Sequence, residues 1–279
     1  MLQRIMLTLV LLLGATAAHA LSLNLDKLTN IIGKAKDLKP VETPDEIEIG
    51  KGVAANLLGA APLVQDEKLQ AYVNRVGWWL VQHTERRDLE WHFGVLDTDS
   101  LNAFAAPGGY VFITRGLLHN LRNEAELAGV LAHEIAHVLR RHHLAAIQKN
   151  AQTGIVADLA SMAVESSKYG VLADRAISAS TELYARGLDK SDEYEADRMG
   201  VVIAARAGYD PYGLPAVLQT LDGMNSQDAG LALMFKTHPT PQSRLQLLDT
   251  AMSGRLDRLN QQKQVAERFT GIVGTKTRN

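Results

Sequence analysis

The sequence predicts an α+β fold that is predominantly helical. Residues 127–139 hold only three polar side chains in thirteen positions, a composition typical of a helix buried on nearly every side. Small and apolar residues recur at helical spacing between 190 and 207 and predict a second helix. Aromatic and β-branched residues at 91–96 and 109–113 predict two strands, separated by a loop that contains a Pro-Gly pair.

The first twenty residues predict a cleaved signal peptide. Arg4 provides its positive region, residues 5–13 its apolar core, and Ala-His-Ala at 18–20 its cleavage site. The apolar core is too short to span a bilayer, and no later segment approaches the necessary length. We therefore expect an exported protein without a membrane span.

The amino-acid composition limits the kinds of binding partner and the cellular compartment expected for this protein. The 279-residue chain has a formal net charge of −2, which favours neither nucleic acid nor an anionic membrane surface as a partner. It has no cysteine, so it has no disulfide framework and no cysteine near the signal for a lipid anchor. A chain without thiols is compatible with an oxidising compartment, and with the signal peptide this favours the bacterial periplasm.

The three polar residues of the apolar helix are His133, Glu134 and His137. The histidines are four residues apart, so on a helix they lie one turn apart on one face. Two imidazoles so placed can bind one zinc ion, and the glutamate beside them can act as a general base toward water. Asn123 is the expected N-cap, with Glu126 completing a variant of the capping box. The alternative is a pair of core histidines whose nitrogens are satisfied by backbone carbonyls.

A catalytic zinc usually has three protein ligands and an open fourth position. On a helix from 190 to 207, Glu193 and Asp197 share a small, apolar face, whereas Glu195 falls on the opposite, solvated side with arginines available for pairing. We therefore assign Glu193 as the third zinc ligand and Asp197 as an acceptor that orients a ligating histidine. The alternative is an acidic helix start favoured by the macrodipole, which explains Asp192 well and Asp197 poorly.

Two further histidines directly follow the motif helix. On a continued helical wheel, His142 lies nearly opposite His133 and His143 lies to one side. We therefore expect both in a basic, solvated tail at residues 140–143.

His238 differs from the other histidines because it lies in a turn-like Thr-His-Pro segment that can fold back over a site. We expect its loop to cover the zinc, with His238 either occupying the open position in a latent state or assisting the oxyanion. Tyr184 and Arg244 are the other candidate donors to the oxyanion, and the sequence does not choose among the three.

Several ordered segments of this chain share their motifs and spacing with a known family. They are Asn102-Ala-Phe-Ala-Ala-Pro-Gly-Gly-Tyr-Val-Phe-Ile-Thr-Arg-Gly116, Glu124-Ala-Glu-Leu ahead of His-Glu-Ile-Ala-His, Glu193-Tyr-Glu-Ala-Asp-Arg-Met-Gly200, Thr237-His-Pro and Ser243-Arg-Leu. Over roughly Asp45 to Leu248 the chain resembles the M48 family of zinc metallopeptidases, in particular its soluble bacterial envelope branch. One departure is visible: family members often carry Ser-Arg where this chain has Asp189-Lys190.

The resemblance implies a gluzincin-like metallopeptidase in which a small mixed sheet packs on the zinc-binding helices. It implies His133, His137 and Glu193 as zinc ligands, Glu134 as catalytic base and Asp197 as a carboxylate behind the ligands. The metallopeptidase domain is expected over residues 45–250, after an N-terminal extension at 21–44 and before a polar C-terminal tail or helix at 251–279.

In gluzincins an exposed sheet edge beside the zinc holds the substrate as an added strand, and by resemblance residues 102–105 are the candidate here. Main-chain hydrogen bonds then bind any extended peptide with modest side-chain selectivity. The alternative is a Gly-Pro hairpin loop without a substrate role.

These features predict an endopeptidase with one Zn²⁺ per chain that hydrolyses extended or misfolded polypeptides. The resemblance implies protein quality control in the bacterial cell envelope, with unfolded or misfolded envelope proteins as partners. A periplasmic chaperone or adaptor with little turnover is the first alternative, although binding alone needs no base such as Glu134. A structural zinc domain is the second, but such sites normally have four ligands and only three good ones are visible.

Overall fold

The computed structural model describes residues 41–87, 89–149, 187–224, 229–259 and 262–274. The expected signal peptide and Tyr184 lie outside the described residues. Within the described part of the chain, no helix combines the length and the apolar character needed to cross a membrane.

Within the described residues, a three-stranded mixed sheet lies at the centre of the fold. Its strands are β1 (His92–Leu96), β2 (Ala103–Ala106) and β3 (Tyr110–Thr114), in the order β1-β3-β2. β3 runs parallel to β1 and antiparallel to β2. Both predicted strands are confirmed, and residues 103–105 of the candidate segment at 102–105 lie in β2. Gly108 and Gly109, with φ of 77° and 100°, make the tight turn between β2 and β3 in a region that favours glycine.

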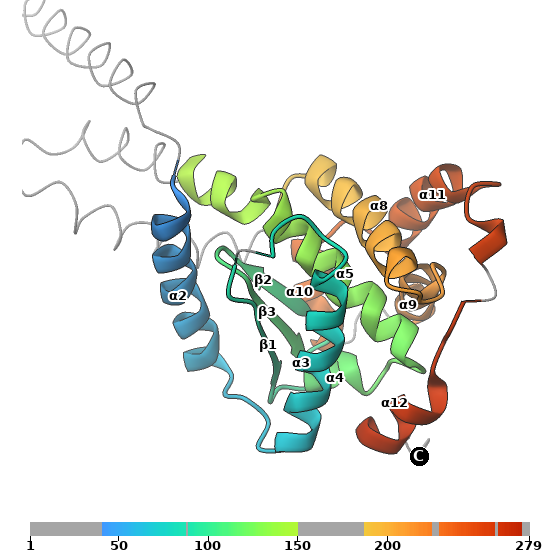
Figure 1. Ribbon diagram of the computed structural model, residues 1–279, viewed down its shortest axis with the longest axis horizontal. Coiled ribbons are helices and arrows are strands. Elements are labelled where there is room, and N and C mark those ends of the chain that lie inside the picture. Colours follow the sequence, from blue (N-terminus) through green and yellow to red (C-terminus); the bar gives the residue numbers. More distant parts are fainter. Residues whose placement is uncertain (1–40, 88, 150–186, 225–228, 260–261, 275–279) are drawn as a thin grey trace, which may run out of the picture.

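The two faces of the sheet pack against different helices, as the alternation of side chains along a strand requires. Val95 and Ile113 point into the main core with α3 (Glu67–Val81) and α5 (Glu124–Leu139). Phe112 lies in a smaller cluster on the opposite face, against α2 (Thr43–Ala60), which flanks the sheet in Figure 1. The other elements are α4 (Arg115–Leu118), α8 (Lys190–Arg206), α9 (Gly213–Asp222), α10 (Ala229–Thr237), α11 (Pro241–Met252), η1 (Asp257–Leu259) and α12 (Ala266–Val273).

The α5 helix begins where its capping residue predicts. The side chain of Asn123 accepts a hydrogen bond from the backbone N–H of Glu126 at 2.9 Å. The reciprocal half of the capping box differs, because the Glu126 carboxylate accepts from the backbone N–H of Arg122 at 2.7 Å. Nearly the whole length of α5 is buried, as the apolar run predicts.

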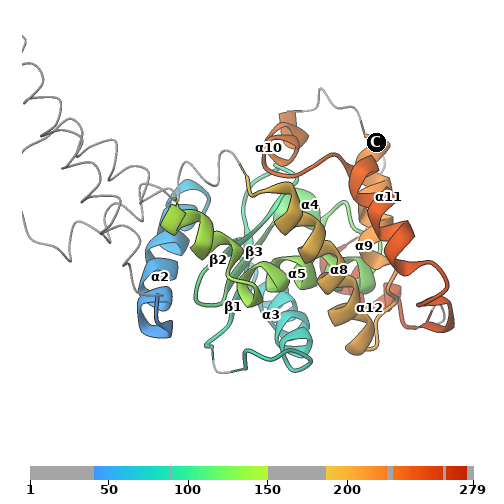
Figure 2. The same cartoon turned by 90° about the horizontal axis from the view of Figure 1, so that it is seen from above.

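α5 and α8 lie side by side in the two perpendicular views, and a glycine permits their close approach (Figure 2). A Cβ on Gly200 of α8 would lie 2.9 Å from the backbone N and 3.0 Å from the Cα of His133 on α5. The absence of a side chain there brings the two predicted motif helices together at the level of the first histidine.

The C-terminal segment contains a helix that packs on the core. Phe269 of α12 is 1% exposed and meets the ring of Tyr72 edge-on, with centroids 6.5 Å apart. Arg268 pairs with Glu124, the first residue of α5, whose carboxylate also accepts hydrogen bonds from the hydroxyls of Tyr72 and Tyr209 at 2.7 Å each. α12 is therefore anchored to the N-terminus of the motif helix.

Candidate active site

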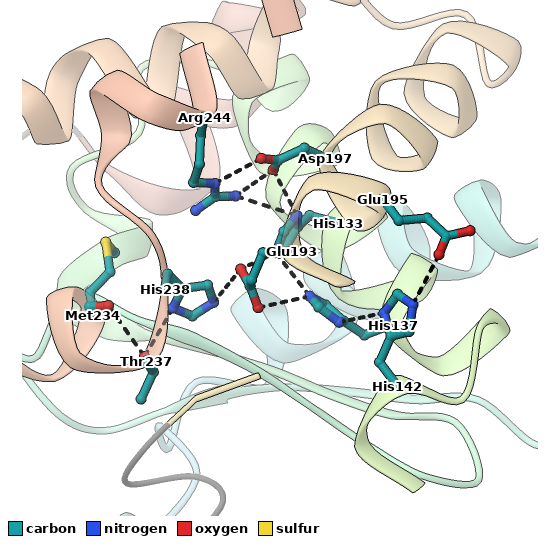
Figure 3. Close-up of polar contacts among 10 residues, drawn as sticks. All are labelled: His133, His137, His142, Glu193, Glu195, Asp197, Met234, Thr237, His238 and Arg244. Atoms are coloured by element: carbon teal, nitrogen blue, oxygen red, sulfur yellow. Dashed lines mark hydrogen bonds and ion pairs between the residues drawn. The ribbon is translucent and has the colours of Figure 1, made fainter. Parts of the chain in front are cut away.

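Three side chains predicted as metal ligands converge between α5 and α8 (Figure 3). Nε2 of His133 lies 3.1 Å from Nε2 of His137. The Glu193 carboxylate reaches both, with Oε2 3.7 Å from Nε2 of His133 and Oε1 3.5 Å from Nε2 of His137. All three side chains are buried.

This geometry fits a divalent cation. Ligand atoms about 2.0–2.2 Å from a tetrahedral zinc lie roughly 3.3–3.6 Å apart, close to the separations of these three groups. Oε2 of Glu193 is buried and makes no hydrogen bond with the residues that the structure describes. A buried carboxylate oxygen without a partner is costly, and a cation between the three side chains would satisfy it. The cluster can therefore hold a metal ion.

Among the described residues, the other ring nitrogens do not make the backbone-carbonyl contacts expected of two ordinary core histidines. Nδ1 of His133 lies 3.0 Å from Oδ1 of Asp197, and Nδ1 of His137 lies 3.1 Å from Nδ1 of His142. In the described part of the chain, these nitrogens contact other side chains rather than backbone carbonyls. Each histidine is thus oriented from behind, with its Nε2 directed into the cluster.

Asp197 is held ionised behind His133. Burial alone would raise the pKa of this carboxyl, but attraction to Arg244 and hydrogen bonds from Arg244 and His133 outweigh burial and hold the pKa well below its usual range. Nε and Nη2 of Arg244 both donate hydrogen bonds to this carboxylate. This candidate oxyanion donor therefore binds Asp197, on the side of His133 that faces away from the three candidate ligand atoms.

Glu134 is buried beside the cluster and shares a cavity with His137, Glu193 and the β2 residue Phe104. Burial raises the pKa of Glu134 to about 8. A nearby cation would favour the ionised form and offset this effect. The position and environment of Glu134 suit a group that accepts a proton near neutral pH.

His238 lies over the cluster, at the end of α10. Its Nε2 is 3.7 Å from Oε2 of Glu193, and its ring centroid is 6.0 Å from that of His133. The Thr237 hydroxyl lies 2.9 Å from its Nδ1, and its backbone N–H donates to the carbonyl of Met234 at 2.8 Å. Burial, with Arg244 nearby, holds the pKa of His238 well below its usual value. The structure thus places the Thr-His-Pro segment over the predicted ligands.

The expected solvated tail at 140–143 is wrong for His142. The α5 helix ends at Leu139, and Arg141 has φ of 55°, so the helical wheel does not continue to this residue. His142 is 6% exposed and lies behind His137. The neighbouring His143 is also not fully solvated: it is half-buried, it lines the cavity shared by Glu134 and His137, and burial lowers its pKa to about 3. No glycine or proline marks this break, so the sequence gives little warning of it.

Comparison with known proteins decides the family. Residues 66–252 match the family described as Peptidase family M48. The chain belongs to peptidase family M48. The predicted α+β fold with a small mixed sheet agrees with the structure of this M48 chain.

Relatives of this M48 chain carry protease names. It is 35% identical over 205 residues to "Beta-barrel assembly-enhancing protease" of Escherichia coli (strain K12), a match that covers 72% of this chain and 42% of the relative. It is 31% identical over 179 residues to "Mitochondrial metalloendopeptidase OMA1" of Schizosaccharomyces pombe, covering 64% of this chain and 51% of the relative. The chain thus spans about half the length of these relatives or less. The names support an endopeptidase.

Proposed function

We propose that this chain is a zinc-dependent endopeptidase that hydrolyses extended or misfolded polypeptides in the bacterial cell envelope. The observation that carries the proposal is the convergence of His133, His137 and Glu193 beside the buried Glu134. An envelope role is supported by the predicted signal peptide and by the printed name of the bacterial relatives, which refers to β-barrel assembly. We place the protein in the periplasm on the same grounds.

The roles of the side chains follow from their positions. His133, His137 and Glu193 would hold the zinc ion, which when bound supplies a more acidic water and polarises the scissile carbonyl. Glu134 accepts the proton of the attacking water and delivers it to the leaving amine. Asp197 keeps the proton of His133 on Nδ1, which leaves Nε2 free to bind metal.

The substrate is proposed to run along β2. Asn102, Ala103 and Phe104 line the same cavity as Glu134 and His137. A peptide aligned with β2 would bring a scissile carbonyl beside the three candidate ligands, where Glu134 can activate the attacking water. Recognition through the main chain suits unfolded polypeptides of varied sequence.

His238 is proposed to control access to the metal, either as an occupant of the open position in a latent state or as a donor to the oxyanion. Its contact with Glu193 supports both roles. In the latent case His238→Ala increases proteolysis, and in the oxyanion case it decreases kcat with little change in KM. Unchanged activity in His238→Ala would contradict both roles.

The decisive experiment compares wild type with Glu134→Gln on an unfolded protein such as reduced casein. The substitution is nearly isosteric, so zinc content and substrate binding should persist while cleavage falls by about 10²–10⁴-fold. The same variant tests the alternative of a periplasmic chaperone or adaptor. If both proteins suppress aggregation of an unfolded client equally and neither cleaves it, the chaperone function replaces the one proposed.

A further inference from the structure

His142 lies on the side of His137 that faces away from His133 and Glu193. Its Nδ1 is 3.1 Å from Nδ1 of His137, and its Nε2 is 3.4 Å from Oε2 of Glu195. Oε1 of Glu195 in turn lies 2.6 Å from Nη2 of Arg140. Three side chains thus continue outward from His137, as the dashed lines of Figure 3 show for His142 and Glu195.

The chemistry of a metal ligand fixes the direction of these hydrogen bonds. A histidine that binds metal through Nε2 carries its proton on Nδ1 and donates it to a partner. His137 must therefore donate to Nδ1 of His142, which leaves the proton of His142 on Nε2, facing the Glu195 carboxylate. Every donor then meets an acceptor, and the outermost carboxylate is paired with Arg140.

This arrangement parallels the one behind His133. There Nδ1 faces the Asp197 carboxylate directly, and Arg244 neutralises that carboxylate. Behind His137 the carboxylate is one imidazole further away and its side chain is 33% exposed. Both candidate ligand histidines thus face a hydrogen-bond acceptor, but the carboxylate lies farther from His137 than from His133.

The position of His142 is fixed by the backbone and by a second ion pair. Arg141, at φ of 55°, makes the turn that brings His142 back toward His137. Non-glycine residues in this region are strained and persist where their surroundings hold them. Nη2 of Arg141 lies 3.0 Å from Oε2 of Glu46, a fully buried α2 residue that also accepts from Arg86. α2 precedes residues 66–252, so the support comes from outside the family match.

We propose that His142 is a positioning residue that orients His137 toward the metal, with Glu195 as the acceptor that fixes its tautomer. The inference rests on the proposed metal site and deepens it. It assigns a function to a histidine that is neither a ligand nor a catalytic residue. Removing such a partner typically weakens metal affinity by about 10–100-fold.

The first test measures zinc affinity by competition with a chelating dye for three variants. His142→Leu fills much of the volume of the imidazole but has no hydrogen-bond acceptor for His137, and should bind zinc about 10–100 times more weakly than wild type. His142→Asn places an oxygen where Nδ1 stands and should retain most of the affinity. His142→Gln extends toward Glu195 instead and should resemble His142→Leu. Equal affinity in His142→Leu and wild type, or equal loss in the Asn and Leu variants, would overturn the proposal.

The second test separates positioning from folding and from failure of the proposed function. Glu195→Gln should weaken zinc binding in wild type but have no further effect in His142→Leu, since the path to His137 is already broken. Equal losses in the two backgrounds overturn the assignment of Glu195.

The visible spectrum of Co²⁺-substituted protein reports the ligand geometry without requiring activity. Absence of metal binding by wild type refutes the proposed function itself, whereas tight binding by wild type and His142→Leu refutes only this inference.

Discussion

Arg244 of α11 and Asp197 of α8 form a bidentate ion pair directly behind His133. Nε of the arginine lies 2.9 Å from Oδ2, and its Nη2 lies 2.5 Å from Oδ1. Oδ1 is also 3.0 Å from Nδ1 of His133. The pair joins two helices and orients a candidate ligand with the same carboxylate, so stability and metal affinity are coupled at this point.

Asp197→Asn should therefore damage both properties. Loss of the carboxylate leaves Arg244 buried and uncompensated, which costs about 3–5 kcal/mol of the free energy of unfolding. It also replaces the charged acceptor of His133 with a neutral amide oxygen, which is a weaker acceptor, and should weaken zinc binding by up to about 10–100-fold. Chemical unfolding and dye competition measure the two effects. Asp192→Asn, in the first turn of the same helix, is the matched control, and unchanged metal affinity in Asp197→Asn would contradict the role of Asp197.

The close approach of α5 and α8 predicts a large difference between two glycine substitutions. Gly200→Ala places a Cβ 2.9 Å from the backbone N of His133, so the helices must separate. We expect a cost of about 1–3 kcal/mol and weaker zinc binding, because the distance from Glu193 to the histidines increases. Gly59→Ala in α2 meets no atom within 4 Å and should stabilise the protein by about 0.5–1 kcal/mol. Thermal unfolding of both variants tests this, and equal effects would contradict it.

The buried base predicts the pH dependence of the metal-free protein. Burial raises the pKa of Glu134 to about 8, so its contribution to stability is complete below its unfolded pKa of about 4.3 and is lost as pH rises through 8. Buried histidines with lowered pKa, such as His137, affect stability only below about pH 6.5, where they protonate in the unfolded chain.

The free energy of unfolding of metal-free protein should therefore decrease from pH 7 to pH 8, by at most about 1.4 kcal/mol per pH unit from Glu134, and this contribution levels off above pH 8. Urea unfolding of protein treated with chelator measures this slope. Glu134→Gln should show a shallower decrease, because its side chain does not titrate. A metal-free wild type that gains stability from pH 7 to pH 8 would contradict the burial of an uncompensated carboxyl at this position.

The ion pair between Glu124 and Arg268 of α12 predicts that a variant of Glu124 loses stability but keeps its catalytic activity. Glu124→Gln removes the charge that pairs with Arg268 and weakens the hydrogen bonds from Tyr72 and Tyr209, at a cost of about 1–3 kcal/mol. Denaturant unfolding should show this cost, while kcat below the unfolding transition stays unchanged. Glu90→Gln, on an exposed carboxylate, is the control. Equal stability of the two variants would show that the buried network contributes nothing.

The sequence predicts the parts of this site that depend on helical phase. His133 and His137 face one way because they are four residues apart, and Glu193 and Asp197 are separated from Glu195 by the same geometry. An uninterrupted helix makes such predictions reliable. The structure accordingly brings the predicted cluster together.

The features that the sequence did not predict depend on where a helix ends or on contacts between distant residues. The buried position of His142 is not visible in the sequence, because α5 stops at Leu139 without a glycine or proline signal. Glu124 pairs with Arg268, 144 residues away, and Glu46 with Arg86, 40 residues away. A carboxylate at a helix start is ordinarily attributed to the macrodipole, so neither pairing is visible from local pattern.

The most direct test of the central claim is the zinc content of purified wild-type protein and of Glu193→Ala, measured by elemental analysis after dialysis against metal-free buffer. The account predicts about one zinc per wild-type chain, loss of proteolysis when that zinc is removed by chelation, and little retained zinc in Glu193→Ala. A wild-type protein that cleaves unfolded polypeptide without stoichiometric metal, or a Glu193→Ala variant that retains the wild-type content, would contradict it.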